Sequence, residues 1–302
     1  MTILKLENFT IGNQEPMTLM GGVNVLESES IVMTVAEKFS KTTSNLNINW
    51  IFKGSFDKAN RSSISSFRGP GLDEGLKMLE KVKSEFNVPV ITDIHEPSQA
   101  DPVSKVCDVI QIPAFLCRQT DLVIAAAKTQ KIIQFKKPQF LSAPEMKNVI
   151  EKCRQAGNEN ITLCERGNSF GYNNLVVDML NFQIMKALGV PVIFDATHSL
   201  QLPGGLGDAA GGRREYLLPL AKAGLSQGIA GLFIEAHPDP DSAKCDGPCA
   251  ISTDEIPVVL SKLSELDDFN KIYNNSKFKN ENKIIDELSE IVGVGPVKAK
   301  EF

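Results

Sequence analysis

One segment of the sequence concentrates side chains that could bind phosphate. Residues 53–63 read KGSFDKANRSS and combine cations, hydroxyls and an amide, namely Lys53, Lys58 and Arg61, Ser55, Ser62 and Ser63, and Asn60. Cations neutralise a phosphate group, while hydroxyls and backbone N–H groups donate hydrogen bonds to its oxygens. The segment therefore predicts a phosphate-binding loop, and a solvated polar loop is the alternative.

Further cations follow two later apolar runs of the chain. Lys136 and Lys137 follow one of these runs, and Arg166 follows the next. The chain as a whole is acidic, with a net charge of −5. Cations gathered at one cleft of such a protein focus positive potential and speed the capture of anions. We therefore expect a small ligand that carries two negative charges.

A third group of residues raises the question of a metal ion. Cys245 and Cys249 form a Cys-x₃-Cys pair without a second Cys or His pair, which is weak evidence for a structural zinc site. His198, Glu235 and Asp246 still need a further ligand. Asn24 is the candidate, but a neutral amide binds transition metals poorly compared with a thiolate. A metal site therefore stays open on the residues alone.

The elements that would carry these residues alternate along the chain. Short apolar runs predict strands at 19–25, 48–52, 88–94, 108–112, 131–135, 160–164, 190–195 and 229–234. Amphipathic segments between them predict helices, with apolar positions at Leu72, Leu76, Leu79, Val82 and Phe86, at Val176, Leu180, Met185 and Leu188, and at Leu217, Leu220 and Leu225. This alternation indicates parallel strands, in either an open doubly wound sheet or a closed (β/α)₈ barrel.

The ends of the apolar runs favour the barrel. Nearly every run ends in polar or charged residues, among them Asn24, Lys53, Ser55, Asp93, His95, Gln111, Lys136, Arg166, Asp195, His198, Glu235 and His237. In a barrel the carboxyl ends of all eight strands meet on one face, where enzymes of this fold have their active sites. We therefore predict an α/β protein of the (β/α)₈ TIM-barrel type.

The predicted domain organisation is simple. Residues 1–302 form a single domain, and residues up to about 18 form a hairpin that closes the floor of the barrel. Leu4, Leu6, Phe9 and Ile11 alternate there, and Gly12-Asn13 offers a turn. From about 270 to 302 we expect a C-terminal extension, with a last helix around Ile284 to Val292 and a tail beyond it.

Composition excludes several classes of protein. The chain is 42% hydrophobic, which is enough for a large core and argues against a disordered chain. No stretch approaches the ~20 apolar residues of a membrane span, and the N-terminus does not read as a secretory signal. Six scattered cysteines do not form a disulfide framework. The acidic charge argues against nucleic-acid binding. We expect a cytoplasmic protein.

Several motifs of the chain resemble the 3-deoxy-D-manno-octulosonate 8-phosphate synthases. Besides KGSFDKANRSS, the motifs are GGVNVLES at 21–28, FRGPGL at 67–72, TDIHEP at 92–97, QIPAFL at 111–116, RQTD at 118–121, KKPQ at 136–139 and FIEAHPDP at 233–240. The resemblance covers roughly residues 10–268. It implies a (β/α)₈ barrel and a transferase that condenses phosphoenolpyruvate with D-arabinose 5-phosphate and water. The products are 3-deoxy-D-manno-octulosonate 8-phosphate, for lipopolysaccharide biosynthesis, and inorganic phosphate.

The resemblance also implies roles for individual residues in a homotetramer. Phosphoenolpyruvate would be bound by Lys53, Ser55, Lys58, Gln111, Lys136 and Arg166. Arabinose 5-phosphate would be bound by Asn60, Arg61, Ser62, Asp93, His95 and Arg118, the last reaching in from a neighbouring subunit. The catalytic set would be Lys58, Lys136, His198, Asp246 and Asn24.

The resemblance bears on the metal as well. Members that require a metal carry Cys at the position of Asn24, beside a His, a Glu and an Asp that match His198, Glu235 and Asp246. The resemblance therefore implies the metal-independent class, with no cofactor and with Asn24 hydrogen-bonded among these residues.

The expected chemistry joins C3 of phosphoenolpyruvate to the aldehyde carbon while water attacks C2 and the C–O bond breaks. Lys58 and Lys136 would stabilise the aldehyde oxygen as it becomes an alkoxide, or protonate the departing phosphate. His198, Asp246, His95 and the substrate phosphate are the alternatives for activating the water. Three other functions stay open: a synthase for erythrose 4-phosphate, a Schiff-base aldolase with Lys53 or Lys136 as nucleophile, and a sugar-phosphate binding protein without catalysis.

Overall fold

Eight parallel strands close into a barrel in the computed structural model, which describes residues 2–61, 63–204 and 211–275. The barrel strands are β3 (Thr18–Val25), β4 (Asn49–Ser55), β5 (Val90–Asp93), β6 (Val109–Ile112), β7 (Ile132–Lys136), β8 (Ile161–Glu165), β11 (Val192–Asp195) and β14 (Gly231–His237). Each strand pairs with its neighbours in chain order, and β14 closes the ring by pairing with both β11 and β3. All eight predicted strands and the closed barrel are confirmed.

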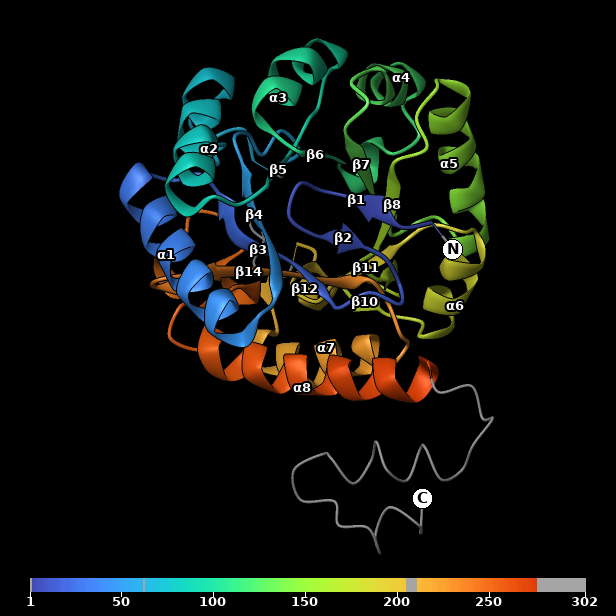
Figure 1. Cartoon of the computed structure of the whole chain (residues 1–302). Helices are drawn as coiled ribbons and strands as arrows, with labels where there is room; N and C mark the ends of the chain where they lie inside the picture. The colour runs from blue at the N-terminus through green and yellow to red at the C-terminus, as the bar shows by residue number, and fades with distance from the viewer. Residues whose placement is uncertain (1, 62, 205–210, 276–302) are drawn as a thin grey trace, which may run out of the picture.

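Eight helices surround the barrel in the described part of the chain (Figure 1). They are α1 (Glu29–Leu46), α2 (Leu72–Phe86), α3 (Ala100–Val106), α4 (Thr120–Lys128), α5 (Met146–Gln155), α6 (Leu180–Ala187), α7 (Leu217–Leu225) and α8 (Ile256–Asn275). Short 3₁₀ turns span Pro97–Gln99, Ala114–Leu116, Ala143–Glu145, His198–Leu200, Arg214–Tyr216, Pro240–Ser242 and Gly247–Cys249. No described helix has the combination of length and hydropathy needed to cross a bilayer.

One predicted helix begins later than expected. Val176 belongs to strand β10 (Leu175–Val176), which pairs with β9 (Asn168–Ser169), so its assignment to a helix is wrong. The helix α6 starts at Leu180, whose N–H donates to the carboxylate of Asp178 at 2.9 Å. This bond satisfies a free N–H at the start of the helix and explains why the helix begins there.

Two apolar cores lie on the two faces of the barrel strands. Inward side chains fill the interior of the barrel on the side of the N-terminal hairpin, and they include Met20, Ile51, Ile91, Val109, Ile132, Cys164, Ile193 and Phe233. Outward side chains such as Phe52, Ile110, Phe135, Leu163 and Phe194 pack against the helices. Successive residues of a strand face opposite sides, so each barrel strand contributes to both cores.

The N-terminal hairpin contacts the inner core, as predicted. Strands β1 (Leu4–Lys5) and β2 (Thr10–Ile11) pair antiparallel, and Leu4 and Ile11 are buried in the inner core. In Figure 1 both strands lie over the centre of the ring of helices. The predicted turn at Gly12-Asn13 is confirmed, since the N–H of Glu15 donates to the carbonyl of Gly12 at 3.2 Å, and the connection between the two strands is closed separately by the N–H of Leu6 on the carbonyl of Phe9. Within this turn the side chain of Asn13 bonds to Val190 and Val192 at the start of β11.

The three remaining short strands are β12 (Gln201–Leu202), β13 (Gly211–Gly212) and β15 (Ile251–Ser252). The predicted extension from about 270 begins within α8, which continues to Asn275. The predicted last helix around 284–292 and the tail beyond it lie outside the described residues. The assignment of residues 1–302 to a single domain stays a prediction.

Candidate active site

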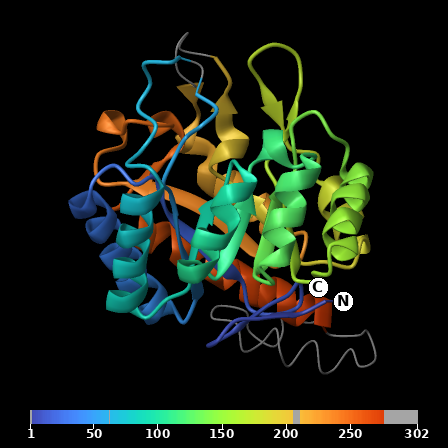
Figure 2. The ribbon, with the colours of Figure 1, turned by 90° about the horizontal axis from the view of Figure 1, so that it is seen from above.

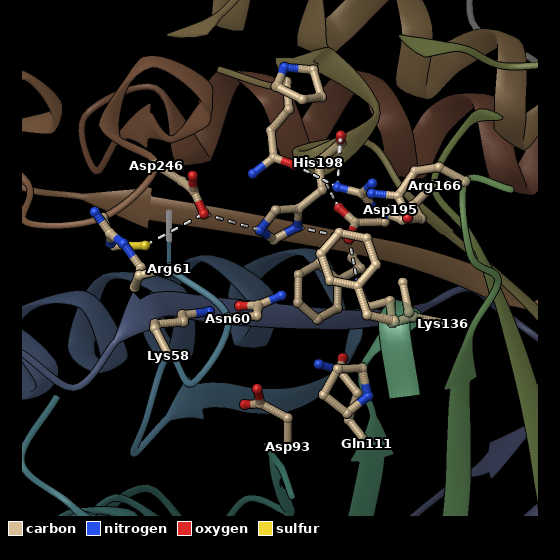
Figure 3. A pocket seen from close by; sticks show the side chains of 18 of the residues that line it. Lys58, Asn60, Arg61, Asp93, Gln111, Lys136, Arg166, Asp195, His198 and Asp246 are labelled. Atoms are coloured by element: carbon tan, nitrogen blue, oxygen red, sulfur yellow. Dashed lines mark hydrogen bonds and ion pairs between the residues drawn. The ribbon is translucent and has the colours of Figure 1, made fainter. Parts of the chain in front are cut away.

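The loops that follow the barrel strands lie on the side of the molecule opposite the N-terminal hairpin (Figure 2). A pocket opens there, at the carboxyl ends of the strands. It is lined by Lys53, Lys58, Asn60, Arg61, Asp93, His95, Gln111, Pro113, Ala114, Phe115, Lys136, Gln139, Arg166, Asp195, His198, Gln201, Pro203, Gly204, Phe233, Cys245 and Asp246. Lys58, Asn60 and Arg61 stand on one side of this space, and Lys136, Arg166 and Asp195 stand on the other (Figure 3). His198 lies between the two sides.

Strand alternation determines which residues reach the pocket. Ile91, Val109 and Ile193 belong to the inner core. Two positions further along the same strands are Asp93, Gln111 and Asp195, which all line the pocket. Side chains two apart face the same side of a strand, so the polar layer sits directly above the apolar filling. Each of these three strands thus places a polar side chain at the rim of the pocket two residues beyond its last apolar inward residue.

Asp195 holds two of the predicted catalytic residues. Its carboxylate accepts a hydrogen bond from Lys136 Nζ and lies 2.7 Å from Nδ1 of His198. It also accepts the backbone N–H of His198 at 2.8 Å. Burial alone would raise the pKa of this fully buried carboxyl, but His198 and Lys136 hold the pKa well below its usual range. Asp195 is therefore a fixed anion between a lysine and a histidine.

A second buried pair lies beside the first. Lys53 Nζ is 2.6 Å from Glu235 Oε1 and also donates to the carbonyl of Asn24 at 2.8 Å. Burial lowers the pKa of Lys53 to about 8, even though Glu235 opposes this shift. Burial would raise the pKa of Glu235, but His198 and Lys53 lower it to about 2. The carboxylate of Glu235 therefore stays ionised at neutral pH, while the ammonium group of Lys53 loses its proton at a lower pH than an exposed lysine does.

The ring of Phe233 lies beneath both lysines. Lys136 Nζ is 3.3 Å from the ring centroid, and Lys53 Nζ is 5.4 Å from it. A cation over an aromatic face is attracted by the quadrupole of the ring, more strongly where water is excluded. Phe233 supports two cations without adding a negative charge that would repel an anionic ligand.

Asn24 links three groups below the pocket. Its Nδ2 donates to Glu235 Oε2 at 2.6 Å and to Asp246 Oδ2 at 3.1 Å, and it lies 3.3 Å from Nε2 of His198. An amide group has two N–H donors, so it can satisfy two of these acceptors at once. No group of three or more His, Cys, Asp or Glu side chains among the described residues is arranged to hold a metal ion.

The other side of the pocket is also polar. The carboxylate of Asp93 lies 3.2 Å from Nε2 of His95. Burial would lower the pKa of Lys58, but the carboxylates of Asp93 and Glu235 raise it above its usual value. Gln111 Oε1 accepts from the buried Gln134 at 3.1 Å, which turns the amide donors of Gln111 away from Gln134. These groups suit a ligand with hydroxyl groups and an anionic end.

The structure brings most of the predicted site residues together. Those that line the pocket are Lys53, Lys58, Asn60, Arg61, Asp93, His95, Gln111, Lys136, Arg166, His198 and Asp246. Asn24 contacts this set from below, and Ser55 is fully buried without lining the pocket. Arg118 is exposed and does not line the pocket of its own chain. Ser62 lies outside the described residues.

Sequence reasoning placed one cation wrongly and missed several neighbours. Lys137 does not join the cations of the pocket, because it faces the opposite side of the strand end and is fully buried. Asp195, Phe233, Gln139 and Gln201 line the pocket but were not among the predicted site residues. Asp195 and Phe233 occupy inward positions two residues beyond Ile193 and Gly231. The polar end of its apolar run was the signal for Asp195, whereas Phe233 lies inside an apolar run and carried no such signal.

Residues 1–271 match the model of the DAHP synthetase I family, and the chain belongs to this family. Its relatives include proteins named 2-dehydro-3-deoxyphosphooctonate aldolase. The one from Pseudomonas putida (strain GB-1) is 60% identical over 271 residues, which cover 90% of this chain and 96% of the relative. The one from Stutzerimonas stutzeri (strain A1501) is 60% identical over 268 residues, or 89% and 95% of the two chains. The one from Pseudomonas aeruginosa (strain UCBPP-PA14) is 59% identical over 271 residues, or 90% and 96%.

Proposed function

We propose that this chain is a 3-deoxy-D-manno-octulosonate 8-phosphate synthase, the enzyme that its relatives' name, 2-dehydro-3-deoxyphosphooctonate aldolase, denotes. It condenses phosphoenolpyruvate with D-arabinose 5-phosphate and water, and it releases inorganic phosphate. The observation that carries the proposal is the pocket, where five cations from distant parts of an acidic chain face one space: Lys53, Lys58, Arg61, Lys136 and Arg166. Two anionic substrates need such a site.

The two sides of the pocket support a division between the substrates. On one side Lys53, Lys136 and Arg166, with Gln111, bind the carboxylate and phosphate of phosphoenolpyruvate. On the other side Asn60 and Arg61, with Asp93 and His95, bind the sugar and its 5-phosphate. Lys58, from the same loop as Asn60, completes the set for phosphoenolpyruvate. The assignments of Ser55 and Ser62 rest on the motif that contains them.

In the reaction C3 of phosphoenolpyruvate joins the aldehyde carbon, water adds to C2, and the C2–O bond then breaks to release inorganic phosphate. The aldehyde oxygen gains negative charge in the first of these steps, and Lys58 and Lys136 are the cations that stabilise it or supply a proton. Positive charge at C2 is stabilised by the carboxylates and the substrate phosphate nearby. Holding both substrates in register contributes up to ~7–11 kcal/mol to the rate enhancement.

A phosphate-release assay tests this function directly. We expect release from phosphoenolpyruvate and arabinose 5-phosphate together and none from either alone, with no loss when a chelator is added. Preference for erythrose 4-phosphate would identify the related synthase, and inactivation by borohydride in the presence of substrate would indicate a Schiff-base enzyme. Absence of release with either sugar would leave a binding protein.

We further propose a cytoplasmic homotetramer without nucleic-acid or membrane partners, in which Arg118 serves the pocket of a neighbouring subunit. The exposure of Arg118 and its absence from its own pocket support this role. Co-expression of Arg118→Ala and Lys136→Ala chains tests it, because mixed oligomers would contain some pockets with both residues intact. Recovery of activity above that of either variant is expected, and no recovery would argue for action within one chain.

A further inference from the structure

The ends of β7 and β8 each carry two consecutive charged residues whose side chains face opposite sides of the barrel wall. Lys136 and Arg166 face the pocket, while their chain neighbours Lys137 and Glu165 are fully buried outside it. Lys137 Nζ lies 3.3 Å from Glu165 Oε1. A buried ion pair is costly to desolvate and is weak evidence for stability as such. Its surroundings point to a different role.

Glu165 fixes the turn that follows β8. Its Oε1 accepts the backbone N–H of Arg166 at 2.9 Å and that of Gly167 at 2.7 Å. Gly167 has φ +86°, a left-handed conformation that glycine adopts without strain. One carboxylate oxygen therefore holds the backbone from which the guanidinium of Arg166 extends.

Lys137 ties the loop after β7 to the segment after β8. Its Nζ donates to Asn168 Oδ1 at 2.9 Å and to the carbonyls of Pro138 and Leu141 at 3.3 and 3.4 Å. Asn168 in turn donates to the carbonyls of Gln139 and Leu141. Gln139 lines the pocket, so these bonds reach a third residue of its wall.

We propose that Lys137 and Glu165 are positioning residues for the anion site formed by Lys136, Gln139 and Arg166. They touch no ligand, and they act by holding the backbone from which these three side chains reach the pocket. The inference rests on the proposed function in taking phosphoenolpyruvate as the anion. A merely structural pair would contribute to stability but would leave the affinity for phosphoenolpyruvate unchanged.

Two double variants separate the roles of charge and geometry. Lys137→Met/Glu165→Gln removes both buried charges but keeps a side-chain oxygen that can accept the N–H groups of Arg166 and Gly167. Lys137→Met/Glu165→Leu removes the acceptor as well. Neither variant leaves an uncompensated buried charge, which is the defect that makes single replacements of such pairs severely destabilising.

Calorimetric binding of phosphoenolpyruvate to the full chain, without sugar, is the main measurement. We expect the Gln variant, which loses the bonds of Lys137 but keeps the acceptor at position 165, to raise the Kd about three- to tenfold. The Leu variant loses the acceptor as well and should raise the Kd further, by more than about tenfold, since misplacement by ~1 Å costs up to ~100-fold. In steady-state assays the KM for phosphoenolpyruvate should rise more than the KM for the sugar. Wild-type affinity in the folded Leu variant would overturn the proposal.

A matched control is available far from the pocket. Asp267 and Lys271 of α8 form another buried pair, 2.9 Å apart, and Asp267 accepts the backbone N–H of Met17 at 2.8 Å. Lys271→Met/Asp267→Leu should lower the melting temperature without changing the Kd for phosphoenolpyruvate. An equal loss of affinity in this control would show that general destabilisation explains the effect, and the proposal would fail.

Gly167→Ala covers the case in which the Leu variant does not fold. This change strains the same turn at φ +86° and leaves Lys137 and Glu165 in place. We expect a raised Kd for phosphoenolpyruvate, and an unchanged Kd would contradict the positioning role. A wild-type chain that binds phosphoenolpyruvate but forms no product would overturn the proposed function alone.

Discussion

At the scale of single residues, the site depends on anions that hold its cations and its histidine. Asp195 bonds both Lys136 and His198, and Glu235 bonds Lys53. The histidine lies between the two carboxylates, with Nδ1 toward Asp195 and Nε2 3.3 Å from Glu235. The five side chains form a continuous chain of contacts across the bottom of the pocket, so removing one member affects its neighbours as well.

Asp195→Asn tests this arrangement. The amide keeps the shape of the carboxylate but loses its charge, so Lys136 and His198 lose their shared anion. We expect kcat to fall about 100-fold, the cost of misplacing a reacting group by ~1 Å. The measurement is phosphate release, with circular dichroism to verify the fold. Asp101→Asn, at an exposed pair with Lys105, should behave like wild type. A kcat within twofold of wild type would rule out this role of Asp195.

Lys53 predicts a dependence of binding on pH. Its pKa in the folded protein is lowered from 10.5 to about 8, so above this pH the free enzyme loses the cation that attracts phosphoenolpyruvate. We expect the Kd to rise up to about tenfold per pH unit above pH 8, because binding then requires uptake of a proton. Calorimetry from pH 7 to 9.5 measures this effect. Lys53→Met should bind weakly with little dependence on pH, and the same slope in that variant would assign the effect to another group.

The same shift has a defined effect on stability. Between about pH 8 and pH 10.5 the unfolded chain binds more protons at Lys53 than the folded chain does. Stability rises with pH wherever the unfolded state binds more protons. The contribution of Lys53 alone therefore becomes less unfavourable as the pH increases through this window.

At the scale of elements, the strands were predictable from sequence but the direction of their side chains was not. Each apolar run became a barrel strand, because parallel strands covered on both faces read as continuous apolar runs. For the same reason no alternation of apolar and polar residues marks which face is inside. Lys136 and Lys137 look equivalent in the sequence, and only the closed barrel shows that one faces the pocket and the other is buried outside it.

The remaining error concerns a short element. The apolar residues near Val176 have helical spacing, but strand pairing with Asn168 determines the structure at Val176. Here a contact with another segment outweighs the local preference, and such contacts cannot be read from neighbouring residues. The turn at Gly12-Asn13, by contrast, follows its local preference, and the side chain of Asn13 also bonds to the start of β11.

The close approach of β3 and β4 gives a prediction at this scale. A Cβ added at Gly22 would lie 2.0 Å from the backbone oxygen of Lys53. Because the obstacle is backbone, Gly22→Ala should separate the two strands and displace Asn24 and Lys53, with a loss of more than about 3 kcal/mol in the free energy of unfolding. Denaturant titration measures this loss.

Gly54→Ala is the matched comparison, since its Cβ would meet side-chain atoms of Leu26 and Val23. Those side chains can move, so a smaller loss is expected. Equal losses in the two variants would show that the backbone contact at Gly22 is not decisive.

At the scale of the whole molecule, the charges of the pocket and of the protein have opposite signs. The chain carries a net charge of −5, while the described residues that line the pocket include five lysines and arginines against three aspartates. An anionic substrate is repelled by the molecule as a whole and attracted at one opening. Fields of this kind raise association rates and are screened by salt, with a Debye length of about 10 Å at 0.1 M.

Ionic strength should therefore affect capture more than stability. We expect kcat/KM for phosphoenolpyruvate to fall about three- to tenfold between 10 and 300 mM potassium chloride. The melting temperature should change little over this range, because the paired charges of the site are buried. Stopped-flow measurement of the association rate separates steering from inhibition by chloride. An association rate that does not depend on salt would contradict the prediction.

The closure of the barrel by β14 has a consequence for protein synthesis. Strand β3, the first barrel strand in the chain, finds its second partner only when β14, the last barrel strand, has emerged from the ribosome. Until then the nascent polypeptide exposes an open row of N–H and C=O groups on β3, and such edges invite pairing with other chains. A pause in translation before β14 has emerged from the ribosome should therefore promote aggregation, whereas a pause after its emergence should be harmless.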